Sequence, residues 1–263
     1  MADSVLLDTR DGVATLTLNR PEAMNSLDVE TKERLRDLVV QVARAPEVRA
    51  VLLTGAGPAF SVGQDLDEHV TLLRQHEAEQ VFETVERHYN PIIETLATMD
   101  KPVVCAVNGM AAGAGASLAL ACDLRIMAQG AAFNFAFTRV GLSCDSGVSW
   151  TLPRLVGPER ALELLYLHET VRADDAVRLG LASRVVADDE LGSVASELAA
   201  RLAQGPTVAL GAIRRSLAYA AEHTLPDTLA FEGQMMRLSG GTADHLAAVE
   251  SFLAKQRPVF RGR

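Results

Sequence analysis

The sequence is poor in basic residues and in cysteine. It has 25 lysines and arginines against 34 aspartates and glutamates, a formal net charge of -9. It therefore lacks the broad basic surface that nucleic acid or anionic lipid would attract. Its three cysteines, Cys105, Cys122 and Cys144, stand among apolar or small residues without metal-ligand spacing. We expect a cytoplasmic protein with buried thiols and no metal, whose partners are small molecules or copies of itself.

The sequence also lacks a convincing membrane segment. The first 21 residues contain no basic region followed by a long apolar run, so we expect no secretory signal. Residues 102–122 carry no charge, but they include Asn108, Ser117 and three glycines, and alanine dominates over leucine. Insertion into hydrocarbon would be weak for such a stretch. A buried strand, a turn and a helix explain it better.

What is present is an alternation of strand and helix patterns in a chain of 263 residues with 48% hydrophobic content. Residues 12–20, 48–57 and 101–109 have the composition of strands, and residues 26–45 show apolar positions at helical spacing. From about Leu191 the pattern is wholly helical. We predict an α/β core over residues 1–195 and a helical C-terminal oligomerisation region over 196–263.

Two glycine-containing turns could carry chemistry. In NGMAAGAGASLAL, Gly113 and Gly115 match half of a dinucleotide fingerprint, but Leu118 stands where its last glycine or alanine belongs. Backbone N–H groups that stabilise an oxyanion remain one interpretation, and close packing of strand on helix remains the other. In AFSVGQDLDEH, the backbone near Gly63 and Gln64 could supply a second donor, or simply begin a capped helix.

Five segments, taken in order, resemble the enoyl-CoA hydratase/isomerase (crotonase) superfamily. They are NRPEAMNSLD, AFSVGQDL, KPVVCAVNGMAAGAGASLALACDLRIMA, FAFTRVGL and RLGLASRVV. The resemblance covers nearly the whole chain. It implies a superhelix of ββα turns, C-terminal helices that pack a homotrimer or a dimer of trimers, an acyl-CoA thioester substrate, and no metal or redox cofactor.

The resemblance also implies a set of site residues. The oxyanion hole would be the backbone N–H groups of Gln64 and Ala114. The residues that would cradle coenzyme A are Glu22, Ala23, Met24, Ser61, Gly63, Asp65 and Leu66. The acyl pocket would include Val70, Leu73 and Phe82. The stretch around His69, His76 and His88 is otherwise polar, and we expect these histidines on a solvated helix surface.

Two departures from the family pattern bear on the reaction. Hydratases carry a pair of glutamates where this chain has Ser117 and Phe137. General acid/base catalysis needs a group that can hold a proton near the working pH, which neither side chain can do. Hydration of 2-enoyl-CoA should therefore be slow or absent.

Asp145, in GLSCDSGVSWTLPRLVG, stands where ring-epoxide phenylacetyl-CoA isomerases and Δ3,Δ2-enoyl-CoA isomerases of this superfamily carry their single catalytic carboxylate. By this resemblance the chain is an isomerase, with Phe137 and Trp150 as apolar neighbours that raise the basicity of the aspartate. The same residue could instead be the N-cap of the following helix. A weakly hydrating lyase and a catalytically silent acyl-CoA-binding module remain alternatives.

Overall fold

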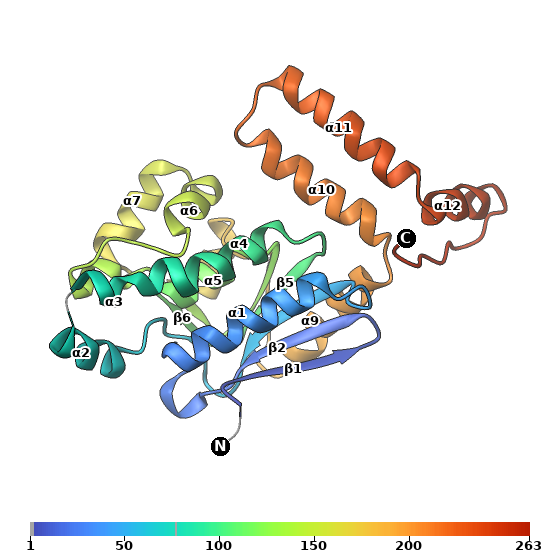
Figure 1. Cartoon of the computed structure of the whole chain (residues 1–263). Helices are drawn as coiled ribbons and strands as arrows, with labels where there is room; N and C mark the ends of the chain where they lie inside the picture. Colours follow the sequence, from blue (N-terminus) through green and yellow to red (C-terminus); the bar gives the residue numbers. More distant parts are fainter. Residues whose placement is uncertain (1–2, 77) are drawn as a thin grey trace.

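Residues 3–76 and 78–263 are described by the computed structural model (Figure 1). They form two sheets. The larger sheet has the order β1-β2-β3-β5-β7-β10 and is parallel except for the β1–β2 pair. Its strands are β1 (Val5–Arg10), β2 (Val13–Leu18), β3 (Ala50–Gly55), β5 (Val103–Val107), β7 (Leu124–Ala128) and β10 (Arg184–Val186). The smaller sheet comprises β4 (Ala59–Ser61), β6 (Met110–Ala112), β8 (Ala132–Asn134) and β9 (Val171–Arg172), in that order.

The chain alternates between the two sheets as it advances. β3, β5 and β7 lie in the larger sheet, and each is followed at once by a strand of the smaller sheet, namely β4, β6 and β8. Helical segments then lead to the next pair. Tight turns make this possible: a Cβ at Gly109 would lie 2.0 Å from the carbonyl oxygen of Pro58. The expected α/β superhelix of ββα turns is confirmed.

Helix α1 (Val29–Arg44) shows how local sequence sets an element. It begins at Asp28, whose carboxylate accepts a hydrogen bond from the Thr31 N–H at 2.8 Å. Its buried face carries the apolar residues at helical spacing, including Leu35 and Val39. This face packs against the larger sheet, while α9 (Leu191–Ala203) packs against β3 and β5.

The uncharged stretch 102–122 divides into β5, β6 and the short helix α5 (Ala114–Leu120), as predicted. No helix among the described residues combines the length and apolarity needed to cross a membrane.

The remaining helical segments connect the strands of the two sheets along the chain. They are η1 (Pro21–Ala23), α2 (Leu66–Gln75), α3 (Ala78–Thr84), the π-helical turn η2 (Val85–Tyr89), α4 (Asn90–Thr98), η3 (Ala136–Val140), α6 (Val148–Val156), α7 (Pro158–Leu167) and α8 (Ala173–Arg178).

The last three helices extend away from the body of the molecule (Figure 1). They are α10 (Thr207–Ala220), α11 (Leu225–Gly240) and α12 (Ala243–Leu253). The predicted boundary between residues 195 and 196 falls inside α9, and α9 belongs to the core because it packs on the larger sheet. The extending arm therefore begins after α9.

Candidate active site

A cavity of about 660 Å³ lies among α2, α3, η2, η3 and the start of α5, and its lining is mostly apolar. It brings together residues that are far apart in the sequence. The sequence-predicted site residues that line it are Gln64, Leu66, Val70, Leu73, Phe82, Ala114, Phe137 and Asp145. Trp150 is not among them.

Gln64 and Ala114 lie side by side because Gly63 lets two backbone segments approach closely. Gly63 has φ +82°, and a Cβ there would lie 2.8 Å from the Ala112 oxygen and 3.0 Å from the Ala114 nitrogen. Leu27 ties down the peptides on both sides of Gln64: its N–H donates to the Gly63 oxygen at 2.8 Å, and its oxygen accepts from Asp65 N–H at 3.2 Å.

The N–H groups of Gln64 and Ala114 have no hydrogen-bond acceptor among the residues that the structure describes. Both residues line the cavity. Two unpaired backbone donors in a mostly apolar cavity can stabilise a developing oxyanion, since few competing dipoles surround them.

Asp145 provides the one carboxyl group among the described residues that line this cavity. Burial raises the pKa of the carboxyl, while the Ser146 hydroxyl, which donates to Oδ1 at 2.8 Å, and the Lys32 ammonium lower it. The N-cap interpretation is wrong, because the N-cap of α6 is Gly147 and no side chain caps this helix. The Asp145 carboxylate is therefore not occupied by the backbone of α6.

No carboxylate stands at the two positions where hydratases carry theirs. Ser117 is fully buried in α5, and its hydroxyl donates to the Gly113 oxygen at 3.2 Å. Phe137 is buried and contributes its ring to the cavity wall. Neither side chain can accept a proton from a water molecule at neutral pH.

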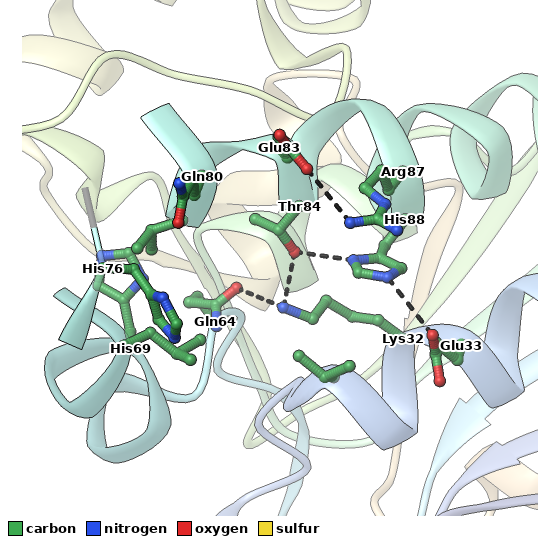
Figure 2. A pocket seen from close by; sticks show the side chains of 13 residues that line it. Lys32, Glu33, Gln64, His69, His76, Gln80, Glu83, Thr84, Arg87 and His88 are labelled. Atoms are coloured by element: carbon green, nitrogen blue, oxygen red, sulfur yellow. Dashed lines mark hydrogen bonds and ion pairs between the residues drawn. The ribbon is translucent and has the colours of Figure 1, made fainter. Parts of the chain in front are cut away.

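Three polar residues near the cavity were not singled out by the sequence analysis as site residues. The side-chain oxygen of Gln64 accepts from the Tyr89 hydroxyl at 2.8 Å and from the Lys32 ammonium at 3.1 Å. Lys32 also donates to Thr84 Oγ1 at 2.8 Å, so its nitrogen lies between Gln64 and Thr84 (Figure 2). One signal could have found Lys32: it occupies the buried face of α1, where an apolar residue is the norm.

The prediction that the three histidines lie on a solvated helix surface is wrong for two of them. His69 and His88 are buried, and burial lowers the pKa of both imidazoles. His69 lies edge-on to Phe82 with the ring centroids 5.6 Å apart. Only His76 is exposed as predicted. The polar neighbours in the sequence concealed this burial, because tertiary contacts produce it: His69 of α2 packs on Phe82 of α3, and His88 belongs to η2, which packs against α1.

The predicted coenzyme-binding residues lie on the η1 turn and on the β4–α2 loop. Glu22 and Met24 are exposed, with Ala23 between them. Ser61 is fully buried and donates to the Asn25 oxygen at 2.7 Å.

The Asp65 carboxylate is held by the loop itself. It accepts from Arg20 at 2.9 Å and from the Ser26 hydroxyl at 2.8 Å, and it caps α2. These contacts hold the pKa of Asp65 below its ordinary value against the opposing effect of burial.

Trp150 is 41% exposed and lies outside the cavity. Its ring lies 4.0 Å below the Arg154 guanidinium, and its indole N–H reaches Glu222 at 3.3 Å. The structure therefore does not bring Trp150 next to the acyl pocket, and Phe137 is the aromatic residue that lies there.

Comparison with known proteins places this geometry among related chains. Residues 8–263 match the family model described as enoyl-CoA hydratase/isomerase. The chain is 43% identical to 1,2-epoxyphenylacetyl-CoA isomerase of Escherichia coli (strain K12), over 100% of both chains. It is 31% identical to the short-chain-enoyl-CoA hydratase of Clostridium acetobutylicum, over 97% of this chain and 96% of the relative.

A solved structure shows the same fold. It comes from Mycobacterium abscessus and is described as an enoyl-CoA hydratase/isomerase. It superposes with a TM-score of 0.95 at 43% identity, covering 98% of this chain and 100% of the other.

Proposed function

Because this chain belongs to the enoyl-CoA hydratase/isomerase family and is an enzyme that processes acyl-CoA thioesters, we propose that it is an isomerase with Asp145 as its only acid/base group. The observation that carries this proposal is the single carboxyl group in an otherwise mostly apolar cavity that also holds two unpaired backbone N–H groups. Coenzyme A belongs to the substrate, and the proposed reaction needs no further cofactor.

The proposed reaction consists of two proton transfers, the first from substrate to Asp145 and the second from Asp145 back to substrate. The ionised Asp145 takes the proton from the carbon next to the thioester. The C–H electron pair becomes the carbon–carbon double bond of the enolate, and the π pair of the thioester carbonyl moves onto its oxygen. The N–H groups of Gln64 and Ala114 donate hydrogen bonds to this oxyanion. In comparable sites, each such donor stabilises the transition state by about 3 to 4 kcal/mol. The protonated Asp145 then returns the proton to the γ carbon of the dienolate, so the double bond moves and no water is consumed.

The raised pKa of Asp145 suits this role. An aspartate in water is too weak a base for an α-proton, and burial makes its carboxylate more basic. The absence of the hydratase carboxylates at Ser117 and Phe137 further favours isomerisation, because among the described residues that line the cavity no second carboxylate is in place to activate water.

The acyl group is proposed to be an enoyl chain or an aryl ring epoxide. Both Phe82 and Phe137 line the cavity, and the Escherichia coli relative is named for a ring-epoxide substrate. Hydration is the second candidate, favoured by the hydratase name of the Clostridium acetobutylicum relative.

The test is isomerisation of a 3-enoyl-CoA, followed as formation of the conjugated 2-enoyl product, with 1,2-epoxyphenylacetyl-CoA assayed in parallel. Replacing Asp145 with Asn keeps the shape of the side chain and removes its basicity. We expect Asp145→Asn to lower kcat by about 10²- to 10⁴-fold, the usual contribution of a general acid/base. Hydration of crotonyl-CoA serves as the control reaction and should be slow in both proteins.

Each contrary result points to a different alternative. Rapid crotonyl-CoA hydration that survives Asp145→Asn would make the chain a hydratase. Tight binding of acyl-CoA without turnover of any of the three substrates would make it a binding module.

A further inference from the structure

Lys32 is the least exposed charged side chain near the acyl cavity, with 1% of its surface accessible. It lines a second cavity of about 500 Å³, which shares Gln64, His69 and Thr84 with the acyl cavity as a common wall. Its ammonium group donates to Gln64 Oε1 at 3.1 Å and to Thr84 Oγ1 at 2.8 Å (Figure 2). The lysine lines the second cavity and not the acyl cavity, and it contacts Gln64, which lines both.

Packing does not require a lysine at this position. Residue 32 continues the buried stripe of α1 that includes Leu35, Val39 and Val42, where an apolar side chain would fill the space without losing the hydration of a charge. Burial lowers the pKa of the Lys32 ammonium, which is the physical sign of this cost. A function at the site offers a reason for the lysine that packing does not.

We propose that Lys32 is a positioning residue for the oxyanion hole, holding the Gln64 side chain in place and setting a positive charge behind the hole. The inference rests on the proposed function for its catalytic consequence. Gln64 Oε1 is held by two donors, Lys32 and Tyr89, so the side chain is fixed while the backbone N–H remains without an acceptor among the described residues.

The two peptides that flank Gln64 are already tied to Leu27, and the bonds from Lys32 and Tyr89 fix the remaining freedom, the side-chain torsions of Gln64. The hole then needs no rearrangement when charge develops on the substrate oxygen, which is the condition for effective electrostatic stabilisation. The lysine charge adds a favourable field for that oxyanion.

The charge also acts on Asp145, whose pKa the Lys32 ammonium lowers against the larger effect of burial. Several titratable groups face Lys32 from the elements packed around it. Glu68, Asp28, Asp65 and Asp145 raise its pKa against the effect of burial. The ammonium in turn acts on His69 and on His88, which pairs with Glu33, and it lies 5.4 Å from the ring centroid of Tyr89. Removing the ammonium should therefore raise the Asp145 pKa.

The test compares Lys32→Met, which keeps the length and removes the charge, with Lys101→Met. Lys101 is a second buried lysine, whose ammonium donates to the carbonyl oxygens of Val42 and Ala45 at the end of α1, outside both cavities. We expect Lys32→Met to lower kcat about tenfold or more with little change in KM, and to move the acid limb of activity to higher pH. Lys101→Met should do neither, and Lys32→Arg should recover part of the loss.

A second readout works without turnover. Acetoacetyl-CoA enolises, and its enolate absorbs in the near ultraviolet, so its bound enolate fraction reports the oxyanion hole directly. We expect this fraction to fall by about threefold or more in Lys32→Met relative to the unmodified protein. If isomerisation is absent but this fall is seen, the proposed function fails and the Lys32 inference stands.

An enolate signal that is equal in the two proteins, or absent from both, overturns the Lys32 inference. So does a kcat loss in Lys32→Met that Lys101→Met matches. If Lys32→Met does not fold, Gln64→Met cuts the same tether from the other end while keeping the backbone N–H. It should also lower kcat and the enolate signal, and unchanged values would again overturn the inference.

Discussion

At the scale of single residues, the environment of Asp145 decides what this carboxyl can do. Burial raises its pKa, and two local contacts, the Ser146 hydroxyl and the Lys32 ammonium, limit the increase. The balance leaves a base stronger than an aspartate in water. Such tuning is typical of groups that must both take up and return a proton.

The pH dependence follows with a definite sign. The proton-accepting form is the ionised one, so activity should be lost as pH falls through the raised pKa. We expect the acid limb of kcat/KM to have its midpoint above the ordinary aspartate value of about 3.9. Ser146→Ala removes a hydrogen bond that favours the ionised form and should move the midpoint higher. A midpoint at or below the ordinary value, or a downward movement in Ser146→Ala, would contradict this account.

At the scale of elements, the β4–α2 loop and the β6–α5 junction form one unit. Their contact depends on Gly63, because the Ala112 oxygen and the Ala114 nitrogen occupy the space where a side chain would stand. The two residues of the proposed hole follow neighbouring strands of the same sheet, Gln64 after β4 and Ala114 after β6, and the parallel β4–β6 pairing holds these strands together. The positions of the two N–H groups are thus set by the backbone of these two segments more than by the side chains of Gln64 and Ala114.

Gly63→Ala tests this unit. The added Cβ would stand on a left-handed backbone and 2.8 Å from the Ala112 oxygen. We therefore expect a loss of about 1 to 3 kcal/mol in unfolding free energy and a decrease in kcat of about tenfold or more. Gly157→Ala is the matched control, since Gly157 has φ +81° with nothing within 4 Å of its Cβ position. It should lose stability by backbone strain alone. Equal kcat losses in the two variants, measured with chemical denaturation alongside, would refute a role for the close approach.

At the scale of the whole molecule, the arm of α10, α11 and α12 leaves apolar surface uncovered in the single chain. Phe252 is 80% exposed, and Leu217 and Met236 are also largely exposed. Water contact with so much apolar surface on neighbouring helices is unfavourable. We propose that copies of the chain cover it in a homotrimer or a dimer of trimers, as the family resemblance implies.

Light scattering on the purified protein checks this proposal. We expect a mass of about three or six times 28.1 kDa. Phe252→Asp, which places a charge in the arm, should reduce the assembly, whereas Leu6→Asp, on the exposed side of β1, should not. A monomeric mass for the unmodified protein would contradict the proposal.

Much of the architecture follows from local patterns. The strand-like runs at 48–57 and 101–109 become β3 and β5, and the amphipathic stretch 26–45 becomes α1. These elements are predictable because the spacing of apolar residues can be read from a short stretch of sequence. The end of the core was less predictable. The sequence around residue 196 has the same helical pattern as the helices that follow it, so the pattern does not tell a helix that packs on the sheet from one that extends away. Only the contacts of α9 with β3 and β5 assign it to the core.

The candidate site divides in the same way. The sequence by itself determined that residues 117 and 137 are a serine and a phenylalanine, not the glutamates of a hydratase, and that an aspartate stands at 145, since those facts depend only on residue identity. The tertiary structure decided the rest: that Asp145 caps no helix, that Trp150 lies outside the acyl cavity, and that Lys32 is buried behind Gln64. Burial and hydrogen bonding join residues distant along the chain, and no local pattern encodes such a meeting.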